Sequence, residues 1–190
     1  MARRVANWIL ASSIALAYHV NSQAEEIKPT AVQYRFGKLP GNKTDECGVV
    51  LFISTYPSPE TTTVRYSMIR SLADGKVNMG LAIEVFDAEF VNGHPEKFNR
   101  VALSRATFSS DHFSSDGRML SFAMADGSIW LGSPSDTVSS DMTNAFSLGD
   151  FHLSFSRVGS KTIRSYSIHE AVPAAILEQF TACAGKMTGQ

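Results

Sequence analysis

The sequence predicts an all-β fold, an antiparallel β-sandwich or curled barrel of about eight strands with one C-terminal α-helix. Three observations support this prediction. Apolar residues alternate with polar ones in short runs, turn dipeptides separate the runs, and the sequence shows neither βαβ alternation nor an internal repeat. With 190 residues, 44% of them hydrophobic and 18% charged, the chain fits one folded domain and excludes a disordered or collagen-like chain.

The first 24 residues have the three parts of a secretory signal peptide. Arg3 and Arg4 form a positive start, residues 5–17 are uncharged and mostly apolar, and small residues precede an expected cleavage after Ala24. The apolar run of about 13 residues suits export but is shorter than the roughly 20 residues of a membrane-spanning helix. An uncleaved anchor or a buried core helix is the alternative. We expect a mature single β-rich domain of residues 25–190, periplasmic or secreted, with no membrane span.

The expected strands follow from alternation with a period of two, which places apolar side chains on one face of each run. They are residues 31–36, 48–54, 76–86, 100–108, 118–125, 128–131, 150–158 and 162–168. Residues 48–54 are continuously apolar, so this strand is expected to be buried on both faces. Residues 61–72 are ambiguous between a helix and a strand, and three consecutive threonines favour the strand.

Turn residues separate these runs. Asp74-Gly75 and Asp126-Gly127 each stand between two β-rich runs and predict hairpins, and Gly159-Ser160 predicts a third. Loops are expected over residues 37–46, 92–97 and 109–117, and a loop or ragged short helix over 133–144. The chain closes with a helix over residues 173–184, which has an apolar stripe at helical spacing and Gly185 as its C-terminal cap.

Cys47 and Cys183 are the two cysteines of the chain. An isolated pair in an oxidising compartment predicts a disulfide, and two buried free thiols are the alternative. The bond would close a loop between positions 136 apart, which chain-entropy reasoning values at about 4–5 kcal/mol. The sequence has no Cys-x-x-Cys, so a catalytic redox pair is not expected.

The search for catalytic motifs is empty. The sequence contains no Gly-x-Ser-x-Gly elbow, no glycine-rich nucleotide loop and no His-Glu-x-x-His. We therefore predict no catalytic, cofactor-binding or metal-binding residue and no cofactor. Glu84, Asp87 and Glu89 are closely spaced, but a solvated strand edge explains them more simply than a paired-carboxylate site.

Two residues remain as a possible binding surface. His112 follows Asp111 in a serine-rich stretch, which suggests a Ser-His-Asp arrangement, although a polar loop is the simpler interpretation. Trp130 comes shortly after the Asp126-Gly127 turn and is either a binding aromatic or, with apolar neighbours on both sides, a core residue.

The last forty residues have a distinctive order of elements. The run FHLSFSR, the turn Gly159-Ser160, the run TIRSYSI and then AVPAAILEQFTAC suggest a strand, a tight turn, a strand and a short helix that ends in Cys183. This arrangement resembles the invasion-associated locus B family of bacterial periplasmic proteins. The resemblance covers about a fifth of the chain. It implies an envelope protein with a β-sandwich and no established enzymatic residues, with Cys47 as a possible partner of Cys183.

Charge and motifs together favour a binding protein. After cleavage, 15 basic residues stand against 18 acidic ones, a net charge of −3 that offers no electrostatic footprint for nucleic acid. We expect an exported, non-enzymatic β-domain that binds another protein or an envelope component. The alternatives are a secreted hydrolase with a site dispersed over loops 92–97, 109–117 and 133–144, and a carrier that holds a small apolar ligand inside a barrel.

Overall fold

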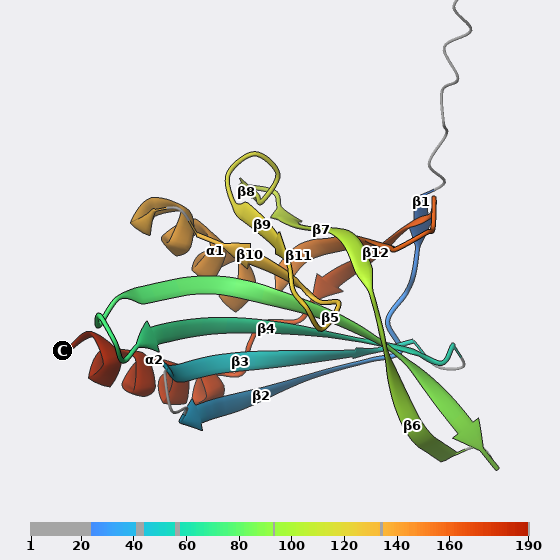
Figure 1. Cartoon of the computed structure of the whole chain (residues 1–190), viewed down its shortest axis with the longest axis horizontal. Coiled ribbons are helices and arrows are strands. Elements are labelled where there is room, and N and C mark those ends of the chain that lie inside the picture. Colours follow the sequence, from blue (N-terminus) through green and yellow to red (C-terminus); the bar gives the residue numbers. More distant parts are fainter. Residues whose placement is uncertain (1–23, 41–43, 56–57, 93, 134, 190) are drawn as a thin grey trace, which may run out of the picture.

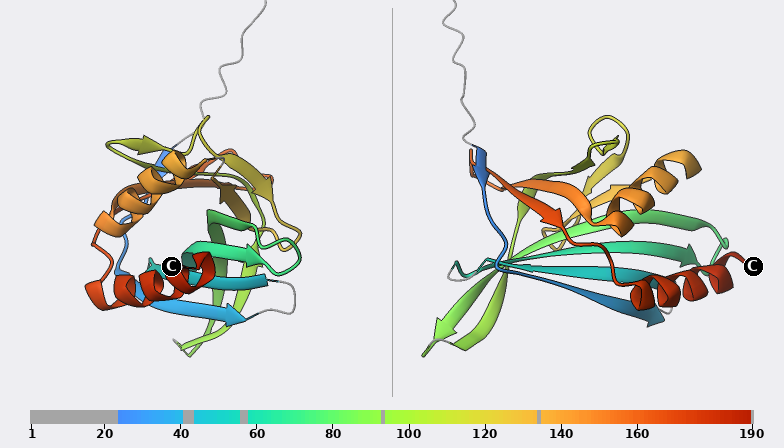
Figure 2. Two further views of the ribbon diagram at one scale, coloured as in Figure 1. Left: turned by 90° about the vertical axis from the view of Figure 1, so that its left-hand side faces the viewer. Right: turned by 180° about the vertical axis from the view of Figure 1, so that it is seen from behind.

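The computed structural model describes residues 24–40, 44–55, 58–92, 94–133 and 135–189. The predicted signal peptide lies outside these residues, apart from Ala24. The described chain forms two sheets packed face to face and two helices, with no closed barrel (Figures 1 and 2). This confirms the prediction of an all-β sandwich, although the described residues form twelve strands rather than about eight.

The larger sheet has seven strands in the order β2-β3-β4-β5-β10-β9, with β6 paired to β5 outside this path. Its strands are β2 (Ala31–Pro40), β3 (Thr44–Ser54), β4 (Glu60–Ser71), β5 (Val77–Val91), β6 (His94–Val101), β9 (Leu120–Ala123) and β10 (Ile129–Gly132). Strands β2 to β5 pair consecutively and antiparallel. Past Asp87, β5 is paired with β6 alone among the described strands, so the two form an arm that projects from the body (Figure 1).

The smaller sheet has the order β1-β12-β11-β7-β8. Its strands are β1 (Ala24–Glu26), β7 (Leu103–Ser110), β8 (Phe113–Ser114), β11 (Asp150–Arg157) and β12 (Ile163–His169). Strands β1 and β12, the first and last of the described strands, are neighbours in this sheet and run parallel. The three predicted hairpins are confirmed, because β4–β5, β9–β10 and β11–β12 all pair antiparallel across the predicted turns.

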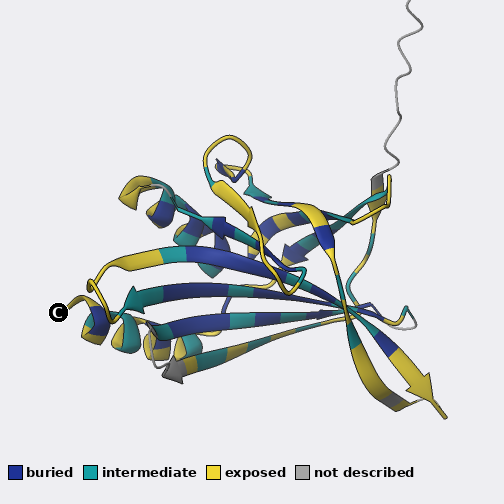
Figure 3. Cartoon of the chain, in the orientation of Figure 1, coloured by how far each residue is buried: buried dark blue, intermediate teal, exposed yellow. Residues whose placement is uncertain are grey.

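The core lies between the inner faces of the two sheets, where the central strands are buried (Figure 3). An aromatic cluster fills it. Tyr66 of β4 packs on Phe146 and Phe180, with ring centroids 5.4 and 5.2 Å apart. Phe151 of β11 continues the cluster to Phe146 and Phe108, at 5.8 and 4.7 Å. These large side chains leave the interior filled rather than hollow.

Two helices lie towards the end of the molecule opposite the arm (Figures 1 and 2). Helix α1 (Asp136–Leu148) begins at Ser135, whose side chain accepts a hydrogen bond from the Val138 N–H. It ends at Gly149, which has a φ of 64°. A side chain at Gly149 would overlap the backbone of Glu170, so this position requires glycine for both its conformation and its contact. The expectation of a loop or ragged helix at 133–144 underestimated this 13-residue helix.

The C-terminal helix α2 (Ala174–Thr188) is longer than predicted. Gly185 lies inside it and Gly189 forms its left-handed cap, so the prediction of a cap at Gly185 was wrong. Met187, in the last turn, is 7% exposed, and its burial favours the extra turn.

The predicted loops are also shorter in the structure. Strand β2 continues to Pro40 and β3 begins at Thr44, so most of the expected loop 37–46 is strand. Strand β6 begins at His94, inside the expected loop 92–97, and β8 lies inside 109–117. Hydrogen bonding between neighbouring strands outweighs the glycine and proline residues that predicted loops in these segments. Gly37, for example, pairs with Gly48 and has open space around its Cα.

Candidate functional site

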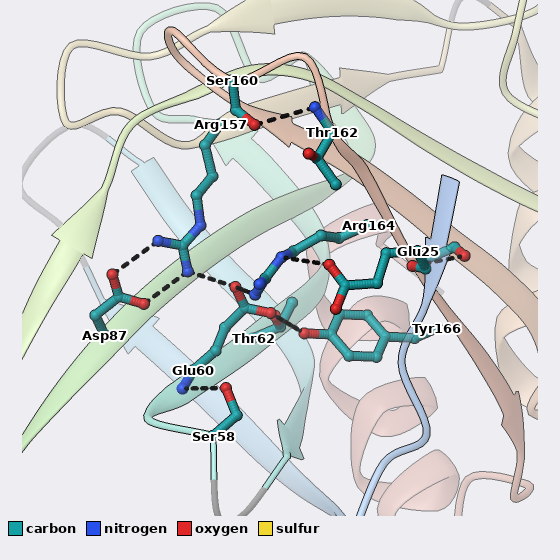
Figure 4. A network of polar contacts seen from close by, with 11 residues as sticks. Glu25, Ser58, Glu60, Thr62, Asp87, Arg157, Ser160, Thr162, Arg164 and Tyr166 are labelled. Atoms are coloured by element: carbon teal, nitrogen blue, oxygen red, sulfur yellow. Dashed lines mark hydrogen bonds and ion pairs between the residues drawn. The ribbon is translucent and has the colours of Figure 1, made fainter. Parts of the chain in front are cut away.

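Glu60 is the one charged residue that is buried in the described part of the chain, with 1% of its surface exposed. Its carboxylate accepts hydrogen bonds from the guanidinium groups of Arg157 and Arg164, each at 2.5 Å, and from the hydroxyl of Tyr166 (Figure 4). The hydroxyl of Thr62 lies 3.3 Å from the Tyr166 hydroxyl. Three donors therefore compensate one buried negative charge.

This cluster joins the two sheets. Glu60 and Asp87 come from the larger sheet, whereas Arg157, Arg164 and Tyr166 come from the smaller one. Asp87 accepts two hydrogen bonds from Arg157, at 2.8 and 2.7 Å. These bonds, together with Glu60, raise the pKa of the Arg157 guanidinium above its usual value. Burial first and the charge of Glu60 second raise the pKa of Tyr166, which therefore stays a protonated donor. Glu60 lines none of the cavities described below, so we interpret the cluster as a structural cross-link.

The two cysteines lie at disulfide distance, with their Cα atoms 6.0 Å apart. Cys47 belongs to β3 and is 1% exposed, and Cys183 is partly buried on α2. The pair fastens the last helix to the inner face of the larger sheet. The sulfur of Met187 lies 3.0 Å from the sulfur of Cys47. A surface cavity of about 410 Å³ is lined by all three sulfur-containing residues.

Trp130 lies on the outer face of the larger sheet, between two core residues. Its neighbours Ile129 and Leu131 are each 2% exposed and face inward, so alternation along β10 turns Trp130 outward. The indole lies against the backbone of the sheet, because a side chain at Gly80 would overlap the ring and one at Gly132 would come within 3.2 Å of Nε1. The structure thus excludes a core position for Trp130.

Three large apolar side chains continue this outward face on and after the neighbouring strand β9. Phe122 is the cross-strand partner of Trp130. Phe122, Leu120 and Met124 are 48%, 54% and 49% exposed. We call Leu120, Phe122, Met124 and Trp130 the aromatic ledge. Exposed apolar groups that gather in this way mark contact surfaces more often than isolated exposed residues do.

His112 is exposed at the turn between β7 and β8, in the smaller sheet, and shares no described cavity with Trp130. It does line a cavity of about 380 Å³ together with Ser110 and Asp141. However, the Ser110 hydroxyl accepts a hydrogen bond from the backbone N–H of His112, and Asp141 pairs with Arg118 at 2.7 Å. Among the described residues no hydrogen bond links the His112 ring to a serine or an acid, as an activated nucleophile needs.

The three closely spaced acids do not form a shared site. Glu84 accepts a hydrogen bond from Thr63 on the outer face of the larger sheet, and Asp87 pairs with Arg157 on the inner face. Glu89 lies on the exposed arm. Because Glu84 and Asp87 point to opposite faces of β5, they cannot act on one substrate as paired carboxylates.

The largest of the described cavities has a volume of about 580 Å³ and lies between the edge of β2 and the end of β12. Like the others, it opens on the surface. No group of three His, Cys, Asp or Glu residues in the described ranges could hold a metal ion. None of the described helices is long and apolar enough to cross a membrane.

Comparisons with protein-family models, with curated proteins and with solved structures found no match to this chain. The resemblance to the locus B family therefore stays a prediction.

The site residues that sequence reasoning missed are Glu60 and its arginine partners. Nothing in the sequence around Glu60, a single glutamate after a proline, indicates that its side chain is buried. Its partners Arg157 and Arg164 are about 100 positions away in the sequence.

Proposed function

We propose that this protein is an exported, non-enzymatic binding module that contacts another protein through the outer face of its larger sheet. The observation that supports this proposal is the aromatic ledge. Phe122 and Trp130 lie side by side on the outer face of that sheet. Both described helices pack instead on inner-face residues such as Tyr66.

The outer face of the smaller sheet provides the contrast. Its outward positions on β7, β11 and β12 are mostly hydroxyl side chains: Thr107, Ser109, Ser154, Ser156, Ser165 and Ser167. Hydroxyl groups hydrogen-bond to water at little cost, so this face is suited to solvent. The ledge has no such compensation, and covering it with a partner would release water from apolar surface.

The charges near the ledge favour a protein partner over a nucleic acid. Arg65 lies 3.4 Å from Glu46, and Arg100 pairs with Glu84 and Asp126. Their positive charges are therefore neutralised within the chain and provide no array for phosphates. Large aromatic and methionine side chains surrounded by paired polar groups match the composition of protein interfaces.

Site-specific photocrosslinking tests the proposal. A benzophenone amino acid is placed at Phe122 on the ledge or, as a matched control, at Ser154 on the hydroxyl-rich face, in the cells that export the protein. We expect one discrete crosslinked product from position 122 that a second change, Trp130→Ala, abolishes, and none from position 154. Equal yields from the two positions, or no product from position 122, would contradict the proposal.

A second test uses fluorescence. Trp130 is the one tryptophan after residue 24, so its emission reports on the ledge alone in the mature protein. The purified crosslinked partner should shift this emission to shorter wavelength and protect it from acrylamide quenching. An emission spectrum that stays unchanged at saturating partner would place the contact elsewhere.

One observation favours a hydrolase as a second candidate, namely the cavity shared by Ser110, His112 and Asp141. If it were catalytic, the mature protein would hydrolyse p-nitrophenyl esters and His112→Ala would abolish this activity. We expect no turnover above that of the His112→Ala variant, because Asp141 is held by Arg118 rather than by the histidine.

A further inference from the structure

We propose that the cavity beside the disulfide binds a small alkyl carboxylate, with the carboxylate between Lys38 and Lys186 and the alkyl chain on the apolar wall. The inference goes beyond the proposed function, because this cavity lies between α2 and the inner face of the larger sheet rather than on the outer face. Its volume of about 410 Å³ is within the usual range of small-ligand sites, and it opens on the surface.

Lys38 places a positive charge on the inner face of the larger sheet, near the end of β2. It lies opposite Cys47 across the β2–β3 ladder, and cross-strand partners project from the same face of a sheet. Cys47 is 1% exposed and belongs to the core. The inner face of β2, which carries Tyr34 and Phe36 against the core, therefore continues with a lysine that borders the cavity.

Lys186 approaches the same cavity from the opposite wall. Gln179, Cys183 and Lys186 are spaced four and three residues apart on α2, so their side chains lie on one face of the helix. This face is turned towards the sheet, because Cys183 lies at disulfide distance from Cys47. Two lysines from different elements thus line one cavity. Their like charges repel each other, and an anion between them would relieve that repulsion.

The other charged residues of the lining are already paired. Arg70 pairs with Asp45 at 2.7 Å and also donates a hydrogen bond to the carbonyl of Met187 at the end of α2. Glu46 projects from the other face of β3, where its carboxylate lies 3.4 Å from Arg65. Both acids that line the cavity are therefore neutralised by arginines, and the charge of the two lysines is left over.

Neither cavity lysine forms an ion pair with an acid of the described chain, whereas Lys76 and Lys97 each do. Both cavity lysines are exposed, so their ammonium groups can reach a ligand from solvent. An ammonium group donates charge-assisted hydrogen bonds to a carboxylate, which are stronger than those between neutral groups. The lysines therefore supply the recognition of the ligand's charge.

The rest of the wall determines what the anion carries. Phe36, Ala182, Met187 and the disulfide line the cavity, and Met187 is 7% exposed. An alkyl chain on this wall would release water from apolar surface, which a fully hydrated inorganic anion does not do. The lining therefore fits a carboxylate with a short alkyl chain better than it fits a free inorganic anion.

Titration of the mature, oxidised protein with octanoate tests the site. Calorimetry measures the affinity, and amide chemical shifts locate the contact. We expect one saturable site, with the shifts concentrated at the end of β2 and in the last two turns of α2. Acetate should bind at least about tenfold more weakly, because burial of two methylene groups already accounts for that factor. Octanol, which has the chain without the charge, should also bind at least about tenfold more weakly.

Two double variants separate the cavity from the overall charge of the protein. Lys38→Met with Lys186→Met removes both ammonium groups and keeps the apolar stems, and it should weaken octanoate binding by at least about tenfold. The matched control, Lys97→Met with Lys161→Met, removes the same charge away from the cavity. Because salt screens distant charges, this control should change the affinity by less than about twofold.

Three results would overturn the proposal: no saturable binding at millimolar octanoate, octanol that binds as tightly as octanoate, or an equal loss of affinity in the two double variants. Amide spectra show whether each variant is folded. If the methionine variant does not fold, Lys38→Gln with Lys186→Gln makes the same test. The cavity shares no residue with the aromatic ledge, so crosslinking from position 122 and octanoate binding fail separately.

Discussion

Replacing Glu60 by Gln should destabilise the protein because it removes the one negative charge that two arginines share inside the sandwich. Arg157 keeps Asp87 at 2.7 Å, but Arg164 keeps only Glu25 at 3.6 Å. Breaking a buried ion pair costs roughly 3–5 kcal/mol. Both arginine side chains are 28% exposed and gain some hydration, so we expect a loss of about 3 kcal/mol, the lower end of that range.

Urea unfolding of the mature, oxidised protein measures this loss. With a slope of about 1–3 kcal/mol/M, the midpoint should fall by about 1–3 M. The matched control is Asp116→Asn, which breaks the exposed pair with Arg105 and should cost less than about 1 kcal/mol. A loss for Glu60→Gln no larger than that of the control would refute the interpretation of the cluster as a cross-link.

A second variant separates charge from packing. In the Glu60→Gln background, Arg164→Met removes the cation that is left without its main partner. We expect this double variant to regain part of the lost stability, because an uncompensated buried charge is more costly than an apolar replacement. A further loss of stability would show that Arg164 contributes chiefly through packing.

Three further predictions concern other parts of the fold. Burial raises the pKa of Tyr66 to about 12, and an unfolded tyrosine titrates near 10, so about 2–3 kcal/mol of stability should be lost as the pH rises from 10 to 12. Urea midpoints at pH 8 and pH 11 should show a smaller alkaline loss in Tyr66→Phe. Gly149→Ala should cost about 2 kcal/mol or more by thermal unfolding, whereas Gly159→Ala, which has positive φ but open space, should cost about 1 kcal/mol. Replacing Cys47 and Cys183 by serine should cost up to about 4–5 kcal/mol and make the urea midpoint insensitive to dithiothreitol.

The sequence predicted those features that local chemistry determines. Asp74-Gly75 and Asp126-Gly127 adopt hairpin turns because glycine accepts the positive φ that such turns need, and the structure gives both glycines positive φ. Alternation along residues 77–85 correctly predicted the inward face of β5. Predicting that Cys47 pairs with Cys183 required only the even number of cysteines and the expectation of an oxidising compartment.

The features that the sequence did not predict depend on contacts between distant segments. The polar stretch that became α1 has few apolar residues, and its buried face, including Met142 and Phe146, is recognisable only against β11 and Tyr66. The position of Trp130 depends on Gly80, 50 residues earlier, which allows the indole to lie against the sheet. The burial of Glu60 depends on Arg157 and Arg164, which join it only after the two sheets meet.

The link between β3 and α2 also affects how the chain folds during synthesis. At about 5–20 residues per second, a ribosome makes Cys47 roughly 7–27 s before Cys183. During this interval β2 to β5 can already pair into a meander, because strands that follow one another in the sequence are also neighbours in the sheet. The apolar side of that nascent meander has no cover until the smaller sheet and both helices emerge. Until then the Cys47 thiol has no partner within the chain, and the inner face of the meander stays exposed.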